Sequence, residues 1–478
     1  MIIKLESIGN YIVINNGDVI HPIQDFKPEP IGTKVKFLSV STGKEVVSGL
    51  FLYTDILNAD SLPIADLAGL LTYLSSFTVQ NEVTLNPLGL DAFNRLRVSQ
   101  VTTLVDLKQL GDSLPLFYDT ETIGAGAAVY NVNDSTSTLS VTNNLDLVIK
   151  QTFQRFNYQS GKSHQIFLTF ANLEPEAGTE KEVGYYNSDI ATPFNTGYDG
   201  IYLSSDGSDI RINQAKNGVI TSYTQNNFNL DKLDGSGKCP VIDFSKGEIL
   251  MIDFEWLSLG AVACALVVDR KIYYFHVFNN ANNVSTSYMR SPNHSVRYSV
   301  RSTGGAGSLE QICATVGTEG ATNITGKQFS ENTAYDFQAN TLGSNYMIYG
   351  MRLKGTHVDH IIDILKIDIM AETNDDFIWE VRLNPSITNV VTWGNITNSA
   401  IQIANGIEGA AASANIVSGG TLIESGNGKG DTQISEEIIN ALKLGSSIAG
   451  IADIITISIT PISAGLDLFV SKTRREVS

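Results

Sequence analysis

The clearest pattern of hydrophobic and polar positions lies in GEILMIDFEWLSLGAVACALVVDRKIYYFHVFNNAN, residues 247–282. Between residues 249 and 257, apolar side chains occupy every second position, and Asp253 and Glu255 fall between them. A period of two with charges on one face predicts a half-buried β-strand. The segment therefore predicts a three-stranded antiparallel meander, whose second and third strands follow the short turns SLG and DRK at residues 261–268 and 272–278.

Short alternating segments recur along most of the chain, and turn residues separate them. The exception is NADSLPIADLAGLLTYLSSF, residues 58–77, where an apolar stripe at helical spacing predicts a helix. We expect a mainly β, multidomain protein built around a central antiparallel β-sandwich of jelly-roll or lectin-like type. Its expected parts are a small α+β attachment domain at 1–79, an extended connector at 80–119, the β-sandwich body at 120–335 and a β-rich C-terminal domain at 336–478.

The composition of the chain limits the classes of partner that we expect. Lys and Arg number 32 against 50 Asp and Glu, which gives a net charge of −18. Binding to a nucleic-acid backbone needs clustered cations, so we expect no nucleic-acid partner. We read no signal peptide at the N-terminus and no run of 18 uncharged apolar residues, so we expect synthesis in a cytoplasm without membrane insertion.

Three cysteines at wide spacings do not form a disulfide framework. Cys264 lies in an apolar strand pattern and is expected to be a buried thiol, not a nucleophile. His276 shares its predicted strand with several aromatic residues, and we interpret it as a packed histidine.

No cofactor is predicted. Three Gly-Lys pairs resemble phosphate-binding loops, but each departs from the required pattern of glycines and the following Ser or Thr, in YQSGKSHQ, LDGSGKCP and GATNITGKQ. No metal site is predicted either. His357 and His360 are three residues apart, and on the strand expected here they would point to opposite faces. Two fragments that resemble pieces of calcium loops lack the closing Glu and are interpreted as hairpin turns, at 15–18 and 206–209.

Two alternatives concern glycans. Asp253 and Glu255 lie about 7 Å apart by strand rise, within the range for an inverting glycoside hydrolase. Surface strands often carry this spacing, so we expect no catalytic residues. Tyrosines could stack on sugars or pack between subunits, and the candidates for glycan contact are Tyr198 and Tyr202, with Tyr185, Tyr186 and Tyr223 beside them.

One segment, NPLGLDAFNRLRVSQVTTLVDLKQLGDSLPLFYD at residues 86–119, resembles a recurrent segment of tailed-bacteriophage virion proteins. The matching residues are Asp91, Ala92, Phe93, Arg95, Leu96, Arg97, Val98 and Ser99, then Asp106, Lys108 and Gln109. YQSGKSHQIFLT, IDFEWLSLGAVACALVVDRKIYYFHVF and LEQICATV are similar to the same group in the same order. The chain departs from the motif at Asn94, where the group carries Gly. Arg95 and Arg97 are candidates to bind a carboxylate partner, but we interpret them as solvated or locally paired arginines.

The resemblance implies a structural virion protein without enzymatic activity, of the head-fibre, capsid-decorating or tail-appendage type. It implies a homo-oligomer, with a trimer favoured for a fibre. The expected partners are other capsid or tail proteins and, as an alternative, a host surface glycan. The expected location is the virion, after synthesis in the bacterial cytoplasm. A glycan-degrading enzyme is the less favoured alternative.

Overall fold

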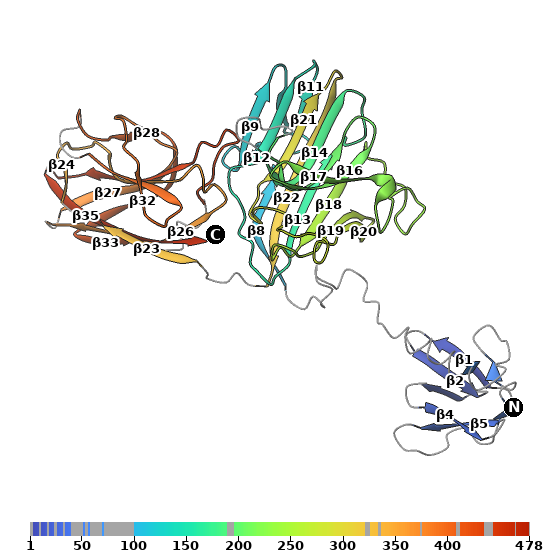
Figure 1. Ribbon diagram of the computed structural model, residues 1–478. Helices are drawn as coiled ribbons and strands as arrows, with labels where there is room; N and C mark the ends of the chain where they lie inside the picture. Colours follow the sequence, from blue (N-terminus) through green and yellow to red (C-terminus); the bar gives the residue numbers. More distant parts are fainter. Residues whose placement is uncertain are drawn as a thin grey trace. The chain divides into compact units, whose positions relative to one another are not determined.

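The protein is described here by a computed structural model (Figure 1), which divides into two compact units, Met1–Pro87 and Leu88–Ser478. Before residue 100 the structure describes short strands and the helical residues Gly69 and Leu70. Beyond that point it describes 100–188, 196–320, 326–332, 336–372, 375–407, 412–434, 443–463 and 465–477. In these described ranges, no helix is long and apolar enough to cross a membrane.

The first unit contains two small sheets. One has the order β3-β2-β1-β7, in which β1 pairs in parallel with β7. Its strands are β1 Ile3–Ile8, β2 Tyr11–Asn16, β3 Val19–Pro22 and β7 Ile56–Leu57. The other sheet consists of β4 Phe26–Ile31, β5 Lys34–Ser39 and β6 Phe51–Leu52. Of the predicted helix at 58–77, the structure describes Gly69 and the buried Leu70, both helical; the rest lies outside the described residues.

The second unit contains the predicted central sandwich. Its first sheet has the order β10-β11-β22-β13-β18-β19-β20, and β8 pairs with β22. These strands are β8 Val101–Lys108, β10 Ala127–Asn131, β11 Thr136–Val141, β13 His164–Ala171, β18 Glu248–Phe254, β19 Val262–Val268, β20 Lys271–Phe278 and β22 Gly307–Glu319.

The second sheet of the sandwich has the order β17-β16-β15-β14-β21-β12-β9. Its strands are β9 Tyr118–Ile123, β12 Leu147–Thr152, β14 Thr179–Asn187, β15 Asp199–Ser205, β16 Ile210–Lys216, β17 Val219–Thr224 and β21 Val296–Ser302. A short 3₁₀ turn, η4 Gln225–Asn227, follows β17. The strands of both sheets pair with one another in antiparallel orientation, so the predicted antiparallel sandwich is confirmed.

The sandwich core follows from the alternation in the strands. Leu250, Ile252 and Phe254 of β18 are fully buried in it, and β18, β19 and β20 form the predicted meander. The prediction of a half-buried strand was wrong, because the opposite face of β18 is also closed: Asp253 is 1% and Glu255 0% exposed. The connector predicted at 80–119 is partly wrong as well, since β8 and the start of β9 belong to the sandwich.

The C-terminal part forms a second sandwich with its own core. One sheet has the order β23-β35-β26-β33, with β24 also on β35; the other has the order β29-β30-β25-β34-β27-β32. The strands of the first are β23 Lys327–Asn332, β24 Phe337–Ala339, β26 Ile361–Ala371, β33 Asp431–Ile434 and β35 Leu466–Val477. Those of the second are β25 Tyr346–Leu353, β27 Asp376–Leu383, β29 Gly394–Asn395, β30 Ile401–Asn405, β32 Thr421–Lys429 and β34 Ile454–Pro461. The strands β28 Ser386–Ile387 and β31 Val417–Ser418 form a separate pair.

A strap at residues 443–453, which precedes β34, binds back onto the central sandwich. The Ser446 amide donates to Phe153 O at 2.9 Å, and the Ile448 amide donates to the Asp119 carboxylate at 2.7 Å. Gly445 permits this approach, because a Cβ there would lie 2.3 Å from Phe153 O. The strap therefore joins the two sandwiches of the second unit.

Candidate functional site

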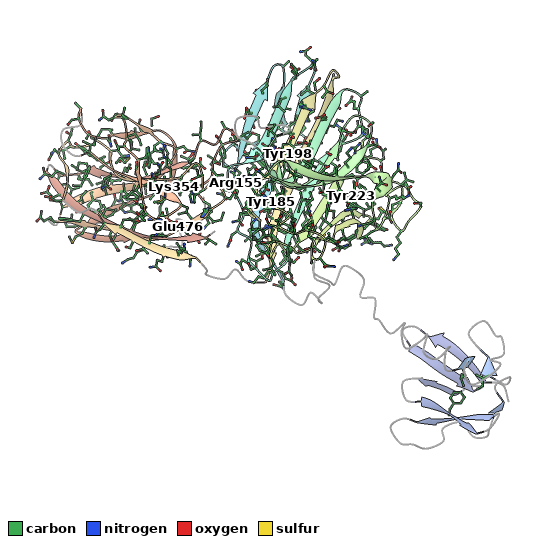
Figure 2. All side chains as sticks on the ribbon, viewed as in Figure 1. Arg155, Tyr185, Tyr198, Tyr223, Lys354 and Glu476 are labelled. Carbon is green, nitrogen blue, oxygen red and sulfur yellow. The ribbon has the colours of Figure 1, made fainter. Side chains whose placement is uncertain are left out.

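The five tyrosines considered for glycan contact occupy three different environments. Tyr185 lies in the sandwich core. Tyr186, Tyr198 and Tyr202 form a separate buried cluster on the other face of the seven-stranded sheet, where ring centroids are 4.7–5.4 Å apart. Tyr223, on β17, is 38% exposed. Figure 2 labels Tyr185, Tyr198 and Tyr223 within the central sandwich.

Tyr198 and Tyr202 are 1% and 3% exposed, so their side chains are not available to a glycan in this structure. The physical reason is a buried carboxylate. Glu182 accepts hydrogen bonds from the hydroxyls of Tyr186 at 2.8 Å, Tyr198 at 2.9 Å and Ser299 at 2.8 Å. A buried carboxylate needs such donors, and these tyrosines supply them.

Arg297 completes this group, here called the Arg297 cluster (Glu182, Tyr186, Tyr198, Tyr202, Arg297 and Ser299). Its guanidinium lies 5.1 Å from the centre of the Tyr186 ring and donates to Gln151 Oε1 at 3.2 Å. Burial raises the pKa of Glu182, and the positive charge of Arg297 opposes that rise. The cluster is a sealed ionic network, so its clearest role is structural.

The carboxylates considered for glycoside hydrolysis are also closed off. Asp253 accepts a short hydrogen bond from the Ser163 hydroxyl, and both Asp253 and Glu255 are at most 1% exposed. A polysaccharide cannot reach carboxyl groups buried to this extent. The structure therefore does not offer this pair as a catalytic site.

The histidines differ from one another. His276 is 1% exposed and packs against the rings of Tyr223 and Phe278 at 4.5 and 4.7 Å, which confirms the packed histidine; burial lowers its pKa to about 4. His357 and His360 lie in the turn before β26, and their rings are 4.9 Å apart. The expectation that they point to opposite faces was wrong, because the turn replaces the strand expected there.

Cys264 is fully buried, as predicted. In the described ranges, one grouping of three potential metal ligands occurs, formed by Asp336, Glu372 and Asp467, and two of these carboxylates are exposed. Arg95 and Arg97 lie outside the described residues.

An open groove in the C-terminal sandwich was not predicted from the sequence. It is lined by residues 354–356, residues 395–398 and Gln402, and its volume is about 530 Å³. We call it the Lys354 groove; Figure 2 labels Lys354 and Glu476 in this sandwich. The Lys354 ammonium group donates to Ile396 O at 2.9 Å and to Ser399 O at 2.5 Å, which holds the turn that forms one wall.

Buried charges support that wall from inside the sandwich. Glu476 accepts from the Ser399 hydroxyl at 2.5 Å and from the Ala400 amide at 2.7 Å. Arg474 Nε donates to Glu476 at 2.7 Å, and Arg474 also pairs with Glu331. These hydrogen bonds lower the pKa of Glu476 against the opposing effect of burial, so the carboxylate is charged at neutral pH. The wall of the groove is therefore built on a rigid base.

A row of polar side chains crosses three strands beside the groove. Arg352 of β25 lies opposite Gln402 of β30, which lies opposite Asn395 of β29. Arg352 Nε donates to Gln402 Oε1 at 2.8 Å, and Gln402 Nε2 donates to Asn395 Oδ1 at 3.2 Å. Trp393 holds Arg352 in place, with its ring 4.5 Å from the guanidinium carbon. We call this row the Arg352 ladder.

The sequence contains each of these residues but gives no signal for their meeting. Arg352 and Gln402 are 50 positions apart, and their pairing depends on the register between β25 and β30.

Comparisons with known proteins leave the family open. No family model matches the chain, and no curated protein matches it. Among solved structures, a legume lectin-like domain from Entamoeba histolytica is 11% identical with a TM-score of 0.29, covering 47% of this chain and 100% of that one. A carbohydrate esterase from the Shiga toxin-encoding bacteriophage phi24B is 12% identical with a TM-score of 0.29, covering 46% and 100%. The Emp47p carbohydrate recognition domain is 14% identical with a TM-score of 0.30, covering 46% and 98%. Likenesses this low support no conclusion about ligand or activity.

Proposed function

We propose that the protein is a non-enzymatic structural component of a bacteriophage particle, of the head-fibre or capsid-associated type, and that it assembles as a homo-oligomer. The starting point is the resemblance of four separate segments to tailed-phage virion proteins. The structure adds where these segments lie in the fold.

The single observation that carries the proposal is that strands from all four segments belong to one sheet. The segments contribute β8, β13, the β18–β20 meander and β22, which pair in the order β8-β22-β13-β18-β19-β20. They are spread over more than 200 residues, yet each of these strands is hydrogen-bonded to the next. The resemblance therefore describes a shared body and not a shared reaction centre, as expected for a building block.

One strand edge supports self-association. β17, at the edge of the seven-stranded sheet, reads VITSYT and carries no charge, and Val219, Ile220 and Tyr223 on it are 75%, 43% and 38% exposed. Exposed uncharged edges invite strand pairing, and natural proteins usually protect them. In a chain with a net charge of −18, an edge without charges is where a second copy meets the least repulsion.

The proposal is tested on purified particles. We expect quantitative mass spectrometry to find the chain at a fixed copy number, and gold-labelled antibodies against it to bind the head. Light scattering of the purified chain should give a multiple of 51.8 kDa, with three copies favoured. Absence from particles, together with a monomer at about micromolar concentration, would contradict the proposal; label on the tail would favour the appendage alternative.

Host-glycan recognition is the second candidate function. The observation that favours it is the Lys354 groove, not the tyrosines first considered. A glycan-degrading activity at Asp253 and Glu255 is not proposed, because both side chains are at most 1% exposed.

A further inference from the structure

The Arg352 ladder fixes which hydrogen-bonding groups the Lys354 groove offers. A guanidinium is always a donor, so Gln402 must turn its oxygen toward Arg352. The Gln402 amino group then faces Asn395, whose oxygen accepts from it. Each amide oxygen accepts one hydrogen bond inside the ladder, and the Asn395 amino group is the donor at its end.

Lys354 extends this surplus of donors. Two of its three ammonium hydrogens are directed to the carbonyls of Ile396 and Ser399, and one remains. The backbone carbonyls of Ile396 and Ser399 in this turn are therefore occupied by Lys354. The groove therefore offers N–H donors from Lys354, Gln402 and Asn395 to a ligand. A ligand rich in hydrogen-bond acceptors satisfies these donors best.

The charge of the groove points the same way. No Asp or Glu is among its lining residues. Lys354 lines the groove and Arg352 is one hydrogen bond away, through Gln402, in a chain whose net charge is −18. A local positive site on an acidic protein attracts an anionic ligand.

We propose that the Lys354 groove binds a carboxylate-bearing saccharide, such as a hexuronate-containing oligosaccharide. The sugar carboxylate lies against the Lys354 ammonium group and the Gln402 and Asn395 amino groups. The exposed hydroxyls of Thr356 and Thr397 face the ring hydroxyls. The volume of about 530 Å³ lies within the range of small-ligand sites, ~300–1,000 Å³. This inference does not depend on the structural role proposed above, because it concerns binding by the purified chain.

The test compares two forms of one oligosaccharide. Tetragalacturonate and its fully methyl-esterified form are titrated into the full-length chain by calorimetry. Both have the same sugar backbone, but the ester lacks the negative charges. We expect the acid to bind, and the ester to bind at least about tenfold more weakly, because charge-assisted hydrogen bonds are about twice as strong as neutral ones.

Two variants locate the binding. Gln402→Glu keeps the contact with Arg352 but replaces an amino donor by a negative charge, so we expect at least about a tenfold loss of acid binding. Lys354→Met removes the ammonium group and should cause a similar loss. Lys429→Met is the matched control, because Lys429 is exposed, lies in the same sandwich and pairs with Asp376 on the surface; its affinity should stay within about twofold of the parent. Thermal unfolding checks that each variant is folded.

Each result decides the proposal. Loss in Gln402→Glu, with the control unchanged, supports it. Equal binding of acid and ester overturns it, as does the absence of binding by either form at millimolar concentration. If sodium sulfate displaces tetragalacturonate at the same concentration as galacturonate itself, the groove holds an adventitious ion only, and the saccharide assignment falls.

Discussion

The Arg297 cluster and the Arg352 ladder are built from the same parts. In each, an arginine on one strand donates to a glutamine on the neighbouring strand and stacks on an aromatic ring. Arg297 is fully buried, and its positive charge opposes the rise in the pKa of the Glu182 carboxylate, whereas Arg352 is partly exposed and contacts an amide and a ring. The same pair of residue types, arginine and glutamine, thus stabilises one sandwich and forms part of a candidate binding site on the other. The difference between the two sites is solvent exposure.

The largest effect is expected from a substitution in the buried Arg297 cluster. Glu182→Ala leaves the buried Arg297 charge without its carboxylate, and we expect a loss of about 3–5 kcal/mol in the free energy of unfolding of the central sandwich. Glu182→Gln, which keeps the shape and some hydrogen bonds, should cost less. Urea denaturation followed by tryptophan fluorescence measures both. A loss below about 1 kcal/mol for Glu182→Ala would show that the Glu182 carboxylate is not needed to stabilise the buried Arg297 charge.

Acid should weaken the sealed sandwich through its buried histidines. His164 packs among Tyr158, Tyr185 and Phe254, and burial lowers its pKa to about 3. The folded protein keeps it neutral while the unfolded chain protonates it below about pH 6.5, so its contribution is present above that pH and is lost as the pH falls. At pH 5 the loss is about 2 kcal/mol.

His164→Phe isolates this contribution, because buried carboxyl groups whose pKa is raised, such as that of Glu182, act in the opposite direction. We expect the unfolding free energy of the variant to change less than that of the parent between pH 7.5 and pH 5. Equal pH dependence in the two proteins would mean that His164 is already able to protonate in the folded state.

The Lys354 groove, which lies beside the Arg352 ladder, should tolerate substitution with a smaller loss of stability. Lys354→Met removes two hydrogen bonds to backbone carbonyls, so we expect a cost of about 1–2 kcal/mol in the C-terminal sandwich, below that of Glu182→Ala. Differential scanning calorimetry measures it, with Lys429→Met as the control. A cost equal to that of Glu182→Ala would show that the groove lysine is mainly structural.

The smallest effect on stability is expected at the exposed edge. Ile220→Lys on β17 should change the unfolding free energy by no more than about 0.5 kcal/mol, because the site is on the surface. A lysine on an edge strand opposes pairing with another strand, so the mass measured by light scattering should fall. An unchanged oligomer would move the subunit contact to another surface.

The strands could be predicted from the sequence where apolar and polar residues alternate strongly. The meander of β18, β19 and β20 was predicted almost to its ends. β8 was missed because its alternation is weak: one of its eight residues is buried, and its place in the sheet comes from pairing with β22, about 200 residues later. Local pattern carries no information about a partner so distant in the chain.

Parity predicts which side chains share a face, but not whether that face is covered. For this reason the sequence placed Asp253 and Glu255 on a solvent face, and Tyr198 and Tyr202 on a binding surface, although all four are buried. The Arg352 ladder was missed for a related reason. Arg352, Gln402 and Asn395 meet through strand register, and one sequence does not reveal register between strands that are not neighbours in the chain.

The pairing of β8 with β22 also bears on how the chain acquires its shape. Val101 pairs with Glu319 in the sheet. The first strand of the eight-stranded sheet therefore cannot pair with β22 until more than two hundred further residues have been synthesised. Contacts of such long range slow folding to the millisecond-to-second regime or beyond. During synthesis, β8 is therefore an unpaired strand, and unpaired strands are the segments that take part in misassembly and domain swapping between copies.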